Sequence, residues 1–240
     1  MLILSIDTSG KSGGITLAEG DKNSFRLLDS APIAGGTFSA QLVPTLASLL
    51  EKHRLAATDI AGFIVVSGPG SFTGLRVGLS AIKGLAEILK KPIATVSLLE
   101  ALAITSGEQG TVAAALDAGR QEIFFGIYDV AGLCVSSAQE QLLSNEEFTK
   151  AITHKREQPL VTSDQTVAEL AESVGVQARK ISRPGSEAAA QIGLHKLLAG
   201  DTVGVEELDA NYIRRSDAEI FHRVIASPGH RVIGKPKGSK

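Results

Sequence analysis

Cysteine is nearly absent from this sequence, since Cys134 is the single one among 240 residues. One cysteine cannot form an internal disulfide, and it cannot supply a zinc site built from several cysteines. This scarcity is typical of a reducing compartment, so we expect a cytoplasmic protein. In it, Cys134 is expected to be a small buried hydrophobe rather than a catalytic thiol.

Long apolar runs are also lacking. No run approaches about 18 residues, and no basic segment precedes the first apolar residues, so neither a membrane span nor a secretion signal is expected. The composition of 43% hydrophobic and 21% charged residues is that of a soluble globular protein. The length suffices for one large domain or two of about 110 residues.

Recognisable catalytic motifs are missing as well. No two of the five histidines are closer than eight residues in sequence, which excludes a helical HxxxH or HExxH metal site. No GxSxG nucleophile elbow is present. We therefore expect no catalytic residue and no metal ligand, and we expect His195 to be a surface residue of a helix.

Acidic side chains are lacking at the C-terminal end of the chain. The net charge is -2, but the residues after Glu219 carry five basic side chains and no acidic one. The remainder is therefore acidic overall, with a net charge of about -7, and is poorly suited to gripping RNA alone. We expect residues 223–240, rich in proline, glycine and lysine, to form a disordered tail.

What the sequence does have is a glycine motif, GPGSFTGLRVG, over residues 68–78. It follows a predicted strand at Phe63–Val66 and opens a predicted helix over 71–90. Gly74, Gly78 and Gly84 recur along that helix, although each interior glycine costs about 1 kcal/mol relative to alanine. This stripe predicts that another backbone approaches the helix closely, and we favour a protein interface over an ordinary turn packed on the chain's own sheet.

Two glycine-rich segments resemble known phosphate-binding motifs in part. The spacing GxGxxxG over residues 68–74 does not fit the dinucleotide fingerprint GxGxxG. The segment SIDTSGKS at residues 5–12 nearly matches a P-loop, but a strand rather than a helix follows it. It is better interpreted as a hairpin turn whose amides could bind an anion, with a plain tight turn as the alternative.

An internal repeat predicts the architecture. A strand at residues 2–6 runs into Asp7 and is followed by a strand at 14–18; 110 residues later, a strand at 112–116 runs into Asp117 and is followed by one at 123–128. This repeat predicts a duplicated α/β fold with two mixed sheets flanked by helices, and one acidic turn from each half facing a shared cleft. The halves are predicted at residues 1–106 and 107–222.

Other elements follow from periodicity and capping residues. Further strands are predicted at 62–66, 93–96 and 159–162. Helices are predicted at 37–53, 71–90, from Ser97 onward, and at 145–153, 165–174 and 186–198.

One family resembles this chain closely. The segment GPGSFTGLRVGLSAIKGLA, in a chain that opens MLILSIDTS, is similar to the TsaB (YeaZ) family. The resemblance extends through Ala115–Ala118 and Tyr212–Arg214, and it covers residues 1 to about 222. It implies a duplicated actin, hexokinase and Hsp70-like (RNase H-like) fold. It also implies a part in forming N6-threonylcarbamoyladenosine at position 37 of tRNAs that read ANN codons.

The resemblance implies a scaffold without catalytic activity of its own. Its partner would be a TsaD-like catalytic subunit in a heterodimer, with a TsaE-like ATPase reached through the complex and tRNA contacted indirectly. The helices at 37–53 and 71–90 would dock in a four-helix contact, and a homodimer could use the same helices when the partner is absent. The interface residues so predicted are Ser39, Leu42, Leu46, Thr73, Gly74, Leu75, Arg76, Gly78, Leu79 and Ile82.

No cofactor is required by this interpretation, although the resemblance leaves room for ATP or ADP with Mg²⁺ in the complex. The candidate nucleotide or phosphate contacts are Asp7, Thr8, Ser9, Gly10, Asp117 and Gly119. A rival hypothesis is an autonomous small-molecule kinase or ATPase that uses Asp7 and Asp117. The chain departs from the family pattern at Phe38, where a histidine is common, and at Ala210, where a proline is frequent.

Overall fold

The computed structural model describes residues 1–155, 157–210 and 213. It contains two five-stranded sheets. The first has the order β3-β2-β1-β4-β5. Its strands are β1 (Leu2–Asp7), β2 (Ser12–Gly20), β3 (Phe25–Ala34), β4 (Gly62–Gly68) and β5 (Ile93–Ser97). The second has the order β10-β9-β6-β7-β8. Its strands are β6 (Gly110–Gly119), β7 (Glu122–Ala131), β8 (Cys134–Ser144), β9 (Leu160–Thr162) and β10 (Ala178–Lys180).

The two sheets repeat one plan, as the sequence predicts. In the first sheet, β1 pairs antiparallel with β2 and parallel with β4; in the second, β6 pairs antiparallel with β7 and parallel with β9. The duplicated mixed α/β fold is therefore confirmed.

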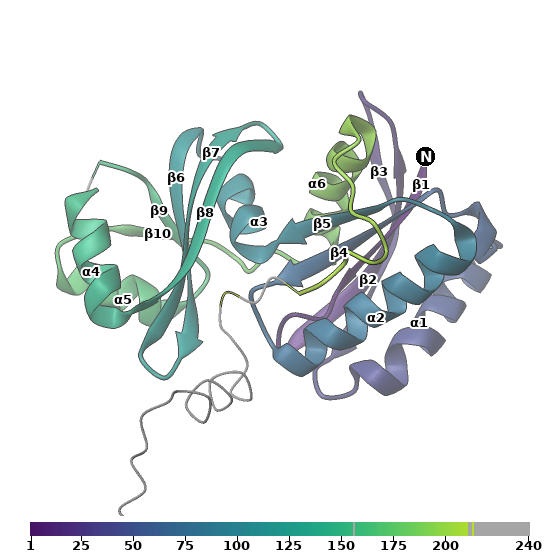
Figure 1. Ribbon diagram of the computed structural model, residues 1–240, viewed down its shortest axis with the longest axis horizontal. Helices are drawn as coiled ribbons and strands as arrows, with labels where there is room; N and C mark the ends of the chain where they lie inside the picture. The colour runs from purple at the N-terminus through teal and green to yellow at the C-terminus, as the bar shows by residue number, and fades with distance from the viewer. Residues whose placement is uncertain (156, 211–212, 214–240) are drawn as a thin grey trace, which may run out of the picture.

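Helices cover the outer faces of both sheets (Figure 1). Helices α1 (Phe38–Lys52) and α2 (Phe72–Leu89) lie side by side on the first sheet. Helices α4 (Asn145–His154) and α5 (Gln165–Ser173) lie on the outer face of the second. A 3₁₀ turn, η1 (Ala57–Asp59), precedes β4.

Two further helices form a shared middle layer between the sheets. Helix α6 (Ser186–Ala199) packs on β1, β2, β4 and β5, while α3 (Leu98–Thr105) packs mainly on β6 and β7. One hydrophobic cluster contains residues of both sheets together with both helices, among them Ile64, Leu102, Leu116 and Ile192. The assignment of residues 107–222 to the second half is wrong for α6, because the chain crosses back to the first sheet.

The predicted helices lie within one or two residues of the observed ones. Ser71 caps α2, its hydroxyl accepting from the Gly74 amide at 3.3 Å, and Ser97 caps α3 in a capping box with Glu100. Three strands were not predicted: β3, β8 and β10. All three are sheet-edge strands, and β3 lacks the clean alternation of buried and exposed residues that would identify it.

Some predictions fall on residues outside the described part of the chain. These include the tail at 223–240 and the family-like segment around Tyr212. Among the residues that are described, no helix is both long enough and apolar enough to cross a bilayer.

A buried ion pair lies in the middle layer. Glu100 of α3 is 4% exposed, and Lys196 of α6 donates to its Oε2 at 2.8 Å and to the Thr95 carbonyl oxygen at 3.1 Å. Burial raises the pKa of Glu100, and the ammonium of Lys196 opposes that rise. Nearby, Tyr128 donates to Glu140 Oε1 at 2.5 Å, and burial raises the pKa of its phenol.

A second polar cluster ties α1 to β3 and predicts an acid-sensitive contact. Lys52 Nζ and His53 Nε2 lie 2.6 and 2.8 Å from Asp29 Oδ2, and their hydrogen bonds lower the pKa of Asp29 from 3.8 to about 2. A depressed carboxyl pKa stabilises the fold above about pH 4, and that contribution is lost as the pH falls toward 2. We expect Asp29→Asn to lose less stability than the wild type over this window in pH-dependent thermal unfolding. Equal losses would show that the contact contributes nothing.

Candidate functional site: the cleft between the sheets

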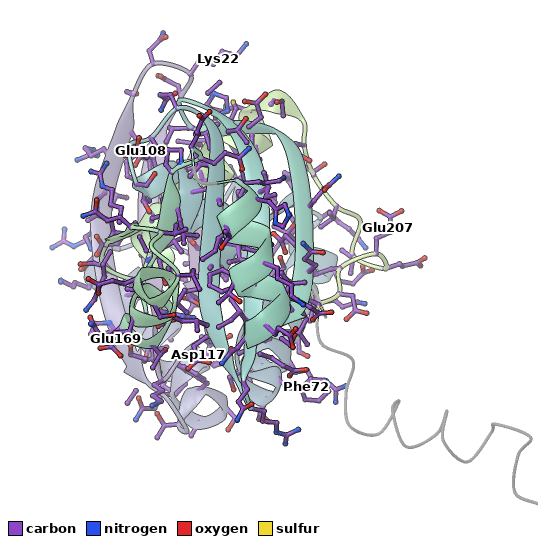
Figure 2. The ribbon with its side chains drawn as sticks, turned by 90° about the vertical axis from the view of Figure 1, so that its left-hand side faces the viewer. Lys22, Phe72, Glu108, Asp117, Glu169 and Glu207 are labelled. Atoms are coloured by element: carbon purple, nitrogen blue, oxygen red, sulfur yellow. The ribbon has the colours of Figure 1, made fainter. Side chains whose placement is uncertain are left out.

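A cleft of about 1460 Å³ opens between the two halves at one end of the molecule. The first half contributes the β1–β2 turn at residues 9–12 and the β4–α2 loop at 69–73; the second contributes the β6–β7 turn at 117–120, Asp164 and Arg183. Figure 2 shows Phe72 and Asp117 at this same end, far from Lys22 and Glu108. The predicted shared cleft is therefore present.

The glycine motif seats α2 directly on the end of β1. The Ser71 amide donates to the Ser9 carbonyl oxygen at 2.8 Å. A Cβ atom at Gly70, Gly74 or Gly78 would overlap Ser9 or Thr8, the Thr8 carbonyl oxygen in the case of Gly74. The stripe does allow a close backbone approach, but the approaching backbone belongs to this chain. The prediction that Gly74 and Gly78 face another protein is wrong.

The apolar residues predicted for the interface are also buried within the chain. They pack in the cluster between the first sheet and the α1–α2 pair, with exposures of 7% or less: Leu42, Leu46, Leu75, Leu79 and Ile82. These five side chains cannot be knobs for a partner without unfolding the pair. Ser39, Thr73 and Arg76 are exposed, and the Arg76 guanidinium lies 3.9 Å above the Phe72 ring.

The two acidic turns share one hydrogen bond but differ in their surroundings. Asp7 Oδ1 accepts from the Ser9 amide at 2.8 Å, and Asp117 Oδ1 accepts from the Gly119 amide at 2.7 Å. Asp7 is 2% exposed and does not line the cleft, whereas Asp117 is exposed and does. The Ser9 hydroxyl also donates to Asp7 Oδ1, at 2.6 Å. Asp7 thus stabilises its own turn.

The other residues predicted to contact phosphate also differ in whether they line the cleft. Ser9, Gly10 and Gly119 line the cleft, while Thr8 is fully buried behind it against Gly78. Phe38, at a position where the family often has histidine, lines the cleft and packs on Gly13. No group of three histidine, cysteine or carboxylate side chains in the described residues is arranged to hold a metal ion.

The cleft has a cationic lining that sequence reasoning did not predict as a group. Lys11, Arg76, Arg120 and Arg183 outnumber its two carboxylates, Asp117 and Asp164. Arg183 Nη2 donates to Ser9 Oγ at 3.1 Å, which joins the two halves across the cleft. These side chains are far apart in sequence, so only the fold brings them together. An anionic ligand is the chemistry that this lining favours.

The prediction that Cys134 is buried, at a position outside the cleft, is wrong. Cys134 is exposed at the start of β8 rather than buried. It lies close to His195, which is on the exposed face of α6 as expected.

Comparisons with known proteins find relatives that are named for one tRNA modification. Residues 32–198 match the family described as TsaD, tRNA N6-adenosine threonylcarbamoyltransferase. The chain is 28% identical over 234 residues to the Escherichia coli protein named tRNA threonylcarbamoyladenosine biosynthesis protein TsaB, with 91% of this chain and 96% of that protein covered. It is 35% identical over 129 residues to the Bacillus subtilis protein of the same name, which covers 53% of this chain and only 55% of that relative.

Solved structures show the same fold. YeaZ from Pseudomonas aeruginosa superposes with a TM-score of 0.69 at 22% identity, covering 88% of this chain and all of that one. A second structure, described as similar to peptidase YeaZ from the same organism, gives a TM-score of 0.71 at 24% identity, covering 89% and 99%.

Proposed function

Because the chain belongs to the TsaB (YeaZ) family, we propose that it is a non-catalytic partner of a TsaD-like enzyme in the formation of N6-threonylcarbamoyladenosine on tRNA. The chain spans little more than half of the Bacillus subtilis relative but nearly all of the Escherichia coli one. The rival hypothesis, an autonomous kinase or ATPase, is not favoured, because the Asp7 carboxylate is buried in its own turn.

Exposed apolar side chains on the α1–α2 pair support a docking role. Among the described residues, five large hydrophobic side chains are exposed, and three of them lie on these two helices: Val43 at 65%, Phe72 at 37% and Ile88 at 79%. The pair is the outermost layer of the first half (Figure 1). Val43 lies in the second turn of α1 and Phe72 is the first residue of α2. Exposed large apolar side chains near the start of two packed helices are typical of a protein interaction site.

The proposed partner surface is therefore the outer face of the pair near the start of both helices. It keeps Ser39, Thr73 and Arg76 from the sequence prediction and adds Val43 and Phe72. The buried leucines and glycines beneath it support the surface without touching the partner.

A charge on this face tests the proposal. We expect Val43→Asp to weaken binding to the TsaD-like partner at least tenfold, equivalent to about 1.4 kcal/mol, because the carboxylate would be desolvated on docking. Isothermal titration calorimetry on the purified chains measures the affinity. The melting temperature of the isolated chain should hardly change, since Val43 is exposed.

Leu27→Asp is the matched control, because Leu27 is 43% exposed on β3 and lies outside the proposed surface. It should bind normally. Normal binding by Val43→Asp as well would rule out this surface, and no binding by the wild type would rule out the proposed partnership.

The other members of the assembly are part of the same proposal. A TsaE-like ATPase and tRNA would be reached through the TsaD-like subunit, and two copies of this chain would use the α1–α2 face when that subunit is absent. Mass measurement by light scattering, with and without the TsaD-like chain, distinguishes monomer, homodimer and heterodimer.

We further propose that the cleft receives a phosphate-bearing ligand at Ser9, Gly10 and Gly119, with ATP or ADP as the first probes. The support is the cationic lining described above. We expect Arg183→Ala to weaken ADP binding about tenfold, and we expect the isolated chain to show no ATP turnover. Mg²⁺-dependent turnover that disappears in Asp117→Ala would instead support the ATPase hypothesis.

A further inference from the structure

We infer that the cleft binds its phosphate-bearing ligand without Mg²⁺, because the guanidinium of Arg183 supplies the positive charge that a metal ion would bring. This inference rests on the proposal above that the cleft receives such a ligand. Free ADP, rather than its Mg²⁺ complex, is then the form that binds.

The carboxylates at the cleft are poorly placed to hold Mg²⁺. In phosphate sites this ion is usually bound by one or two carboxylates that also face the phosphates. The Asp7 carboxylate is 2% exposed and does not line the cleft, and its Oδ1 already accepts from the amide and the hydroxyl of Ser9. Asp117 lines the cleft, but its Oδ1 accepts from a backbone amide of its own turn and its Oδ2 from the Thr166 hydroxyl at 3.4 Å. Asp164 Oδ2 accepts from the Asp117 amide at 2.8 Å, so these donors do not fit the metal.

Arg183 brings a cation to the β1–β2 turn from the opposite half of the molecule. Its Nη2 donates to Ser9 Oγ at 3.1 Å. The guanidinium lies against the backbone of Gly10, since a Cβ atom built there would be 3.3 Å from Nε and 3.4 Å from Nη2. Ser9 Oγ in turn donates to Asp7 Oδ1 at 2.6 Å, so the buried carboxylate orients the serine that holds the guanidinium. The positive charge is thereby fixed at this turn.

The loop that carries Arg183 is held to both sheets. Before it, the Ile181 amide donates to the Thr162 carbonyl oxygen at 2.9 Å, in the second sheet. After it, the Ser186 hydroxyl lies 2.8 Å from the Thr16 hydroxyl of β2, in the first sheet. Arg183 itself is exposed and lines the cleft. The guanidinium is therefore positioned before a ligand arrives and stays open to it.

The chemistry of a guanidinium suits a phosphate. Arginine presents five N–H donors in a planar fork and remains charged in proteins. The hydrogen bond to Ser9 uses one of these donors, and paired N–H groups of the fork can bind two phosphate oxygens in parallel. Lys11 adds a second positive charge to the lining of the cleft. The chain thus supplies the charge that a metal ion supplies in many nucleotide sites.

Titration of the full chain with a fluorescent ADP derivative, in excess EDTA or in excess MgCl₂, tests the inference by anisotropy. We expect the wild type to bind at least as tightly in EDTA as in MgCl₂, because Mg²⁺ neutralises part of the charge that the guanidinium attracts. Arg183→Ala should weaken binding in EDTA about tenfold. Added MgCl₂ should then tighten binding by this variant about threefold, since the metal replaces the missing positive charge. A residue that only tethers the two halves would not produce this reversal.

Arg179→Ala is the matched control, because Arg179 is an exposed cation of β10 that pairs with Glu108 and does not line the cleft. It should bind as the wild type does in both conditions. Binding by the wild type in MgCl₂ alone would overturn the inference and leave the cleft proposal standing. Unchanged binding by Arg183→Ala, or equal weakening in both conditions, would also overturn it. No binding of ADP by the wild type in either condition would overturn the inference and the cleft proposal together.

Discussion

Gly74→Ala is expected to destabilise the isolated chain by about 2 to 3 kcal/mol, and Gly78→Leu by at least as much. The new Cβ at position 74 would overlap the Thr8 carbonyl oxygen, which is backbone and cannot move without disturbing β1. Overpacking of a closely packed contact typically costs 1 to 3 kcal/mol. For a chain of this length, the melting temperature should fall by roughly 4 to 12 °C in calorimetry.

Gly84→Ala supplies the control within the same helix. Nothing lies within 4 Å of a Cβ atom built at Gly84, and alanine favours a helix interior by about 1 kcal/mol. This variant should therefore be slightly more stable than the wild type. If Gly74→Ala were instead fully stable and lost only its partner, the glycines would have to face outward, contrary to the structure.

Lys196→Met should cost about 3 to 5 kcal/mol, because it leaves the Glu100 carboxylate buried without its cation. The pKa of Glu100 is already raised by burial, and losing Lys196 raises it further. The penalty should shrink as the pH falls and the carboxyl group becomes neutral. Urea unfolding at pH 8 and pH 5 measures the difference.

The double variant Lys196→Met with Glu100→Gln identifies the cause. Glutamine keeps an oxygen for the Ser97 amide but carries no charge, so most of the lost stability should return. Lys150→Met, at an exposed pair with Glu146, should change stability little. A double variant no better than the single one would mean that Lys196 acts through packing.

The sequence predicted the fold wherever local patterns determine structure. The starts of α2 and α3 were predicted from the capping residues Ser71 and Ser97. The repeat around Asp7 and Asp117 predicted two equivalent sheets. The edge strands β3, β8 and β10 were missed because edge strands need no continuous apolar pattern.

The site was less predictable because its contacts are distant in sequence. Arg183 meets Ser9 across 174 positions, and no local pattern indicates that pairing. The glycines of α2 illustrate a different limit. Their spacing correctly indicated a close backbone approach, but spacing cannot tell whether Thr8 or another protein makes it.

The middle layer of α3 and α6 has a mechanical consequence. Two lobes that each enclosed their own core could swing about a hinge and change the width of the cleft between them. Here, swinging would pull α3 away from one of the two sheets that it contacts and expose one continuous core to water. The cleft is therefore expected to keep a constant width. Heat should melt both sheets in a single cooperative transition rather than one lobe at a time.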